Sequence, residues 1–135
     1  MNRRVRSMLR VLVVLLVVLA AAAIWFKVKY DRMVKVFEEA EVTQVDLWQI
    51  DDGTYTGSFG EFLVSAELEV TVENHRIVDL VVLDQRCGPG YRAEDTLNRI
   101  LNAQSPLVYA TTGATASSRC IMIATYLALM EATPD

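Results

Sequence analysis

The hydrophobic pattern of this chain changes from one continuous apolar run to strand-like alternation and then to helical spacing. The run from Val11 to Phe26 contains no charged residue, so it predicts a helix in a membrane. It is somewhat short for a span, but Met8 and Leu9 can extend it and the flanking basic side chains can reach the headgroups. Four arginines precede it and place the N-terminus in the cytoplasm, with the rest of the chain outside. They are Arg3, Arg4, Arg6 and Arg10.

A cleaved signal peptide is the alternative interpretation of this run, because Ala20 and Ala22 form an A-x-A cleavage site. Both interpretations put the following domain outside the cytoplasm. We expect residues 27–41 to continue the helix as a polar-faced stalk. The chain then divides into residues 1–41 (basic cytoplasmic tip, membrane anchor and stalk) and residues 42–135 (extracytoplasmic domain). The apolar residues that lead into the domain are expected to pack on it: Val45, Leu47, Trp48 and Ile50.

Residues 62–72 alternate strictly between apolar and polar, which predicts a half-buried strand. Its apolar face consists of Phe62, Val64, Ala66, Leu68, Val70 and Val72. Asn74 and His75 are a plausible two-residue turn, because Asn tolerates a positive φ. Residues 76–84 then form a second, more buried strand of the same hairpin. Residues 54–56 are β-formers between two glycines and predict a further, short strand.

Helical spacing takes over after a Gly- and Pro-rich turn. The repeating apolar positions are Ala93, Leu97, Ile100 and Leu101. They predict a helix over residues 92–103, which Pro106 stops, followed by a short strand over 107–109. From about Thr115 to Met130 the chain is apolar on most sides, as in a buried helix. The predicted fold class is α+β: an N-terminal transmembrane helix followed by a small antiparallel-sheet domain with two packed helices.

The charge of the domain excludes one class of partner. Residues 36–135 carry five Arg, no Lys and sixteen Asp or Glu, a formal charge of −11. Such a domain repels a phosphate backbone, so we expect no nucleic-acid partner.

Side-chain chemistry is sparse. The one histidine, His75, lies in a predicted turn, so a Ser-His-Asp site, a Cys-His site and a zinc site all lack residues. There is no P-loop and no GxGxxG motif, and redox chemistry would therefore need a bound cofactor. The two cysteines, Cys87 and Cys120, either form a disulfide or are two free buried thiols.

The stretch TTGATASSRC, residues 111–120, directly precedes the last apolar run. In the structural interpretation Gly113 makes a turn and Thr112 or Thr115 caps the helix through its hydroxyl. In the functional interpretation the free N–H groups of the helix start bind a phosphate. Gly113 and Ala114 leave the backbone accessible there, and a hydroxyl can hold the phosphate by hydrogen bonds or an ester.

These residues resemble the extracytoplasmic FMN-binding domain. That domain occurs in the sodium-pumping quinone reductase, in a related ferredoxin-linked complex and in small membrane-anchored bacterial proteins. The signature S/T-G-A-T-x-T/S matches Thr112–Thr115 and the following ASS. Three further stretches recur in the family's order: VDL..I.DGTYTG from Val45 to Gly57, the hairpin LEVTVENHRI, and Gln104-Ser105. Together they span about residues 45–131.

The resemblance implies an FMN whose phosphate is ester-linked to Thr115. A separate flavin transferase that uses FAD and magnesium is implied as the partner that attaches it. Thr112, Ser117 and Ser118 are expected to donate hydrogen bonds, while Gly113 and Ala114 keep the approach to the hydroxyl open. The implied role is electron transfer outside the cytoplasm, as a flavin carrier more than as a stand-alone enzyme.

One position departs from the family's covalent motif. An aspartate normally stands three residues before the Ser/Thr of S/T-G-A-T, and Tyr109 stands there in this chain. Three alternatives therefore stay open. FMN can be held without a covalent bond, the domain can be a degenerate non-redox interaction module, or the flavin can serve an enzyme that reduces a small acceptor.

Overall fold

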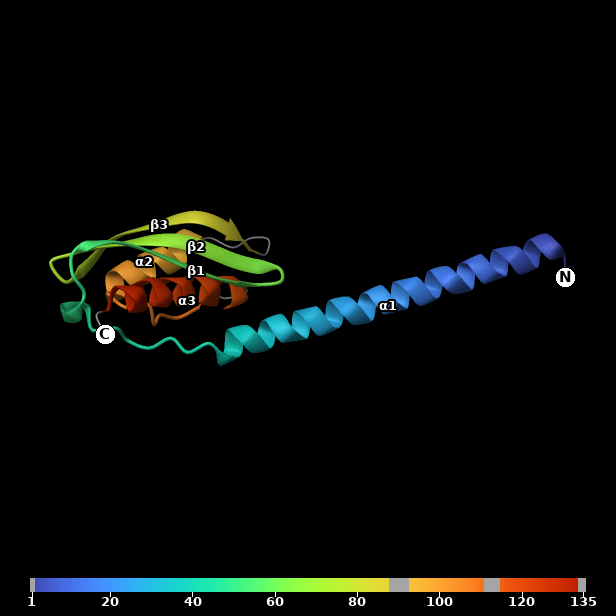
Figure 1. Ribbon diagram of the computed structural model, residues 1–135, viewed down its shortest axis with the longest axis horizontal. Helices are drawn as coiled ribbons and strands as arrows, with labels where there is room; N and C mark the ends of the chain where they lie inside the picture. Colours follow the sequence, from blue (N-terminus) through green and yellow to red (C-terminus); the bar gives the residue numbers. More distant parts are fainter. Residues whose placement is uncertain (1, 88–92, 111–114, 134–135) are drawn as a thin grey trace. The chain divides into compact units, whose positions relative to one another are not determined.

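The computed structural model describes residues 2–87, 93–110 and 115–133, and it confirms the α+β class. A long apolar N-terminal helix is followed by an antiparallel sheet and two more helices (Figure 1). In the part of the chain that is described, the elements are α1 (Arg3–Glu39), the 3-10 turn η1 (Leu47–Gln49), β1 (Gly53–Glu61), β2 (Val64–Glu73), β3 (Arg76–Arg86), α2 (Ala93–Ala103) and α3 (Thr115–Ala132).

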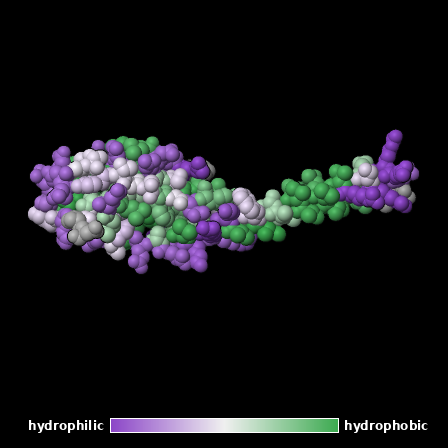
Figure 2. Space-filling view, in the orientation of Figure 1, coloured by the Kyte–Doolittle hydropathy of each residue, from purple (hydrophilic) through white to green (hydrophobic). Residues whose placement is uncertain are grey.

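The first part of α1 belongs to a compact unit of its own, Met1–Arg32. This helix is long and apolar enough to cross a membrane. Figure 2 shows a hydrophobic surface along it and a hydrophilic N-terminal tip. A signal sequence near an N-terminus has the same features, so the uncleaved anchor and the signal peptide both stay predictions.

The sheet has the order β1-β2-β3 with antiparallel neighbours, as consecutive hairpins require. Asn74 and His75 form the predicted turn between β2 and β3, with φ of 50° and 61°. The β1–β2 hairpin turns at Phe62 and Leu63, with φ of 54° at Phe62. The prediction that Phe62 belongs to the strand face was therefore wrong, and β2 begins at Val64. A tight turn takes precedence over local alternation here.

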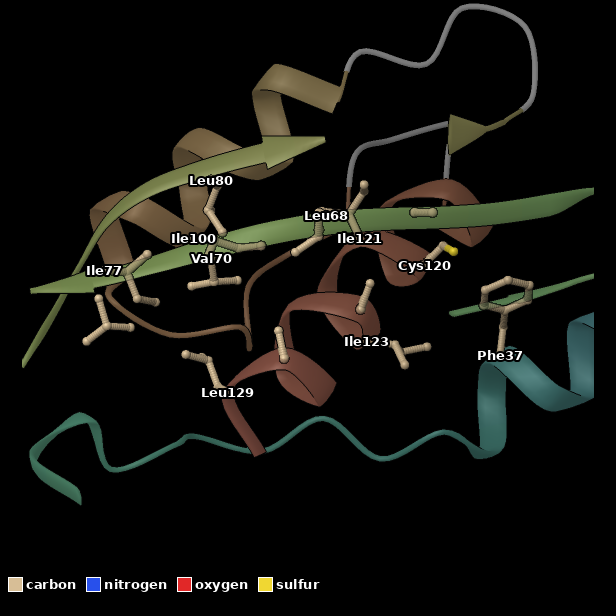
Figure 3. Packing of buried hydrophobic residues seen from close by; sticks show 14 of the residues in the cluster. Phe37, Leu68, Val70, Ile77, Leu80, Ile100, Cys120, Ile121, Ile123 and Leu129 are labelled. Atoms are coloured by element: carbon tan, nitrogen blue, oxygen red, sulfur yellow. The ribbon is translucent and has the colours of Figure 1, made fainter. Parts of the chain in front are cut away.

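Helix α3 covers the apolar face of β1 and β2, and α2 lies against β3 on the same side (Figure 1). The side chains on the inner face of β2 are buried, as their alternation predicts. Figure 3 shows Leu68 of this strand beside Ile121 of α3. Gly57 lets α3 come close to the sheet, because a Cβ at this position would lie 2.1 Å from the Ala124 carbonyl oxygen. β1 is longer than the expected short strand because it pairs with β2 over its whole length.

The second compact unit runs from Met33 to Asp135, so it includes the last turns of α1. Met33 and Phe37 are 2% exposed and belong to the core of the domain. The Phe37 ring, labelled in Figure 3, meets the Phe59 ring of β1 edge to face, with centroids 5.4 Å apart. The expected stalk, residues 27–41, thus contributes to the core of this unit as well as joining it to the apolar helix.

Three further local predictions were wrong. Strand β3 was expected to be more buried than β2, yet only Ile77 and Leu80 of β3 are buried, because β3 lies at the edge of the sheet. Residues 107–109 form no strand, since they follow the bend at Ser105-Pro106 without pairing to the sheet. Trp48 was expected to pack on the domain, yet it is 77% exposed. The neighbours Leu47 and Ile50 are buried as expected. The 3-10 turn rotates Trp48 outward, and its ring stacks on His75 instead, with centroids 4.6 Å apart.

Candidate functional site

Helix α3 begins at Thr115, the residue expected to carry the phosphate. The Thr115 side chain is exposed, whereas Ser117 and Ser118 are 5% and 0% exposed. The two serines lie one turn before Ile121, on the side of α3 that faces the sheet. Of these three hydroxyls, the one at Thr115 is therefore accessible to a phosphate or to a modifying enzyme.

The remaining residues of the motif, Thr112, Gly113 and Ala114, lie outside the described residues. Their expected roles in binding the phosphate stay predictions. The first turn of α3 contains no acidic side chain, so the partial positive charge of the helix start is not offset within that turn.

Arg119 lies one turn after Thr115 on the same face of α3. Its Nε donates a hydrogen bond to the Phe37 carbonyl oxygen and its Nη2 donates one to the Ala40 carbonyl oxygen, both at 2.9 Å. These carbonyls belong to the C-terminal end of α1, where a helix leaves its acceptors unpaired. Arg119 therefore caps α1 from within α3. Sequence patterns alone assign Arg119 no role, and its spacing of four residues from Thr115 is the one signal that points to it.

The segment before the motif is held by α2. Arg99 Nη1 donates to the Tyr109 carbonyl oxygen at 2.8 Å. The Tyr109 side chain itself is 89% exposed. The Tyr109 ring thus faces solvent, while its backbone is tied to the domain.

Gln104 and Ser105, two residues of the resemblance, have structural roles. The Gln104 amide accepts from Ile77 N at 2.7 Å and donates to the Ile77 and Leu101 carbonyl oxygens at 2.9 and 2.7 Å. Ser105 Oγ accepts from Leu107 N at 3.1 Å. These bonds connect α2 to the edge of β3 and turn the chain toward α3.

Cys87 and Cys120 are both free thiols, so the structure contradicts a disulfide between them. Cys120 is buried and its Sγ donates to the Phe59 carbonyl oxygen at 3.1 Å. Burial raises the pKa of Cys120 to about 12, against a smaller lowering by a hydrogen bond with the Ala66 backbone. Cys87 is exposed, so the alternative of two buried thiols holds for Cys120 alone.

A groove of about 460 Å³ lies on the outer face of the sheet, away from α3. Its lining residues are Ser58, Phe59, Gly60, Ser65, Ala66, Glu67 and Asp84. Glu67 and Asp84 stand directly opposite each other on β2 and β3. Two carboxylates disfavour an anion, so this groove is a poor phosphate site. Across residues 2–87, 93–110 and 115–133, no three metal-ligating His, Cys, Asp or Glu side chains come together.

No model of a known protein family matches this chain, and a comparison with curated proteins gives no match either.

Proposed function

We propose that this chain is a membrane-anchored FMN-binding protein that carries electrons outside the cytoplasm, with the FMN phosphate ester-linked to Thr115. One observation carries the proposal: Thr115 is the first residue of the 18-residue helix α3, and its side chain is exposed. The TGAT motif thus ends where a helix begins, which is where free backbone N–H groups favour a phosphate.

The described residues fit an FMN phosphate at this position. Thr115 offers an accessible hydroxyl, the first turn of α3 carries no acid, and Arg119 brings a positive charge to the same face. Attachment needs FAD and a flavin transferase. Thr115 Oγ1 forms a bond to the phosphorus of the FMN half, the bond between that phosphorus and AMP breaks, and the hydroxyl proton passes to the transferase.

Bound FMN supplies the redox chemistry, and the chain supplies attachment and location. Helix α1 holds the protein on the membrane, and the four N-terminal arginines orient the domain outward. The acidic domain, with a formal charge of −11 over residues 36–135, suits protein partners and small carriers more than nucleic acid.

The test is co-expression of the full chain with a flavin transferase, followed by denaturing electrophoresis and in-gel flavin fluorescence. Wild type gives a fluorescent band, Thr115→Ser retains part of it, and Thr115→Ala is dark. Thr56→Ala is the matched control, because Thr56 is an exposed threonine on β1, away from α3. A fluorescent Thr115→Ala band would contradict attachment at Thr115.

Tyr109 favours a second candidate, FMN bound without the ester. Its exposed ring stands where the family's covalent motif has an aspartate that a transferase would meet. In that case the purified native protein is yellow and loses its flavin on denaturation. Tyr109→Asp then restores a fluorescent band on the gel. A colourless native protein that stays dark in both forms would refute FMN binding and leave Thr115 as a helix cap.

A further inference from the structure

The side chain of Arg119 extends toward the start of α3. Side chains on an α-helix lean toward its N-terminus, so a residue covers the turn that precedes it. For Arg119 that turn contains Thr115, four residues earlier. The guanidinium donates to the carbonyl oxygens of Phe37 and Ala40, so it lies between α3 and the C-terminal end of α1.

Some N–H groups of the Arg119 guanidinium are not used in the bonds to α1. Arginine carries five N–H groups in one plane, and two of them are engaged with α1. The bonds to the two carbonyls hold this plane in one orientation, so little side-chain entropy is lost when a further acceptor binds. A phosphate is the acceptor that this group prefers.

The surroundings make a cation useful at this place. Glu38 and Glu41 are exposed acids at the end of α1, Glu39 is paired with Lys35 at 3.7 Å, and the carbonyl end of that helix is itself negative. An anion near this end of α1 would be repelled, and Arg119, which is bonded to it, brings a compensating positive charge. Arg119 is half-buried and joins the two helices, so solvent screens its charge less than that of a fully exposed side chain.

We propose that Arg119 is a positioning residue for the FMN phosphate: two of its N–H groups hold the end of α1, and the others and its charge hold the phosphate at Thr115. This inference rests on the proposed function. The two hydrogen bonds that cap α1 also fix the orientation of the Arg119 guanidinium, the group that recognises the FMN phosphate.

The experiment measures non-covalent binding of FMN and of riboflavin, which lacks the phosphate, to the full chain in detergent. All proteins carry Thr115→Ala so that no ester forms, and binding is followed by flavin fluorescence. We expect Arg119→Gln to weaken FMN about tenfold and to leave riboflavin unchanged. Arg119→Lys, which keeps the charge, weakens FMN less. Arg76→Gln is the matched control, since Arg76 is an exposed arginine beside the β2–β3 turn.

Protection of Cys120 from alkylation verifies that each variant is folded. If Arg119→Gln weakens the binding of FMN and of riboflavin equally, the inference is overturned and Arg119 is a helix cap only. The same conclusion follows if the substitution changes the binding of neither flavin. If Cys120 becomes reactive in Arg119→Gln, that variant is unfolded, and the comparison of FMN with riboflavin is made with Arg119→Lys in its place. A retained preference for FMN over riboflavin supports the inference, and a lost preference overturns it. A parent protein that binds neither flavin, together with an unflavinylated wild type, refutes the proposed function and this inference with it.

Discussion

Gly57→Ala is the substitution that most directly tests how α3 is held against the sheet. A Cβ at residue 57 would lie 2.1 Å from the Ala124 carbonyl oxygen and 2.8 Å from both the Cβ and the backbone nitrogen of Ala128. Two of these atoms belong to the backbone of α3, so rotation of a side chain cannot relieve the overlap. The helix must move away from β1 by roughly 1 Å, which weakens the packing along the whole interface.

The expected cost is at the upper end of the range for overpacked cores, about 3 kcal/mol. That is a large part of the stability of a small domain, which is about 5–15 kcal/mol. With a urea m-value of about 1.5 kcal/mol/M, the unfolding midpoint falls by about 2 M. The displaced helix also carries Thr115, so flavin attachment should fall in the same variant.

The assay is a urea titration of the full chain in detergent in which brief alkylation reports exposure of Cys120, with Cys87→Ser as the background. Gly53→Ala is the matched control on the same strand. The three atoms nearest to a Cβ at Gly53 all belong to the Tyr55 side chain, at 3.2–3.6 Å, and the far end of a side chain can shift by the few tenths of an ångström required. Equal midpoints for the two variants would refute the argument that α3 and β1 are in closest contact at Gly57.

Three more predictions concern the buried thiol and the edge of the sheet. In the native protein Cys87 reacts rapidly with an alkylating reagent while Cys120 reacts only on unfolding, and mass spectrometry would detect two equal rates if this is wrong. Burial raises the pKa of Cys120 to about 12, so the thiol contributes fully to stability below pH 9. Above pH 9 the thiol ionises in the unfolded chain first, and the free energy of unfolding falls by about 1.4 kcal/mol per pH unit until about pH 12. Urea midpoints of wild type and Cys120→Ala, both followed by far-UV circular dichroism, should therefore converge as the pH rises, and a constant difference would contradict the shift. Gln104→Met keeps the side-chain length but loses the bonds to Ile77 and Leu101, so thermal unfolding should show a loss of about 2 kcal/mol, with exposed Gln44→Met as the unaffected control.

Much of the fold could be predicted from local sequence patterns. The β2–β3 hairpin followed from strict alternation and from Asn74-His75, because a two-residue turn with positive φ needs only neighbouring residues. Helices α2 and α3 followed from apolar spacing, and the apolar run that begins near Thr115 predicted where α3 starts, with Thr112 or Thr115 as its cap. The error at Phe62 has the same origin, since alternation cannot reveal where a strand gives way to a turn.

The candidate site was predictable only in part. The sequence indicates hydroxyls at a helix start, but the separation into an exposed Thr115 and buried Ser117 and Ser118 depends on which face of α3 meets the sheet. The role of Gln104 was likewise hidden, because its partner Ile77 lies 27 residues away.

The sequence by itself determined the apolar N-terminal helix, the hairpin, the two later helices and the place of the TGAT motif, because each depends on residues within one or two turns of one another. Only the tertiary structure decided that Met33 and Phe37 join the core of the domain and that Arg119 caps α1. The contacts of Arg119 join residues 79 and 82 positions apart. No periodicity encodes such pairs, since they form only when the packing of α3 on the sheet brings the two helix ends together.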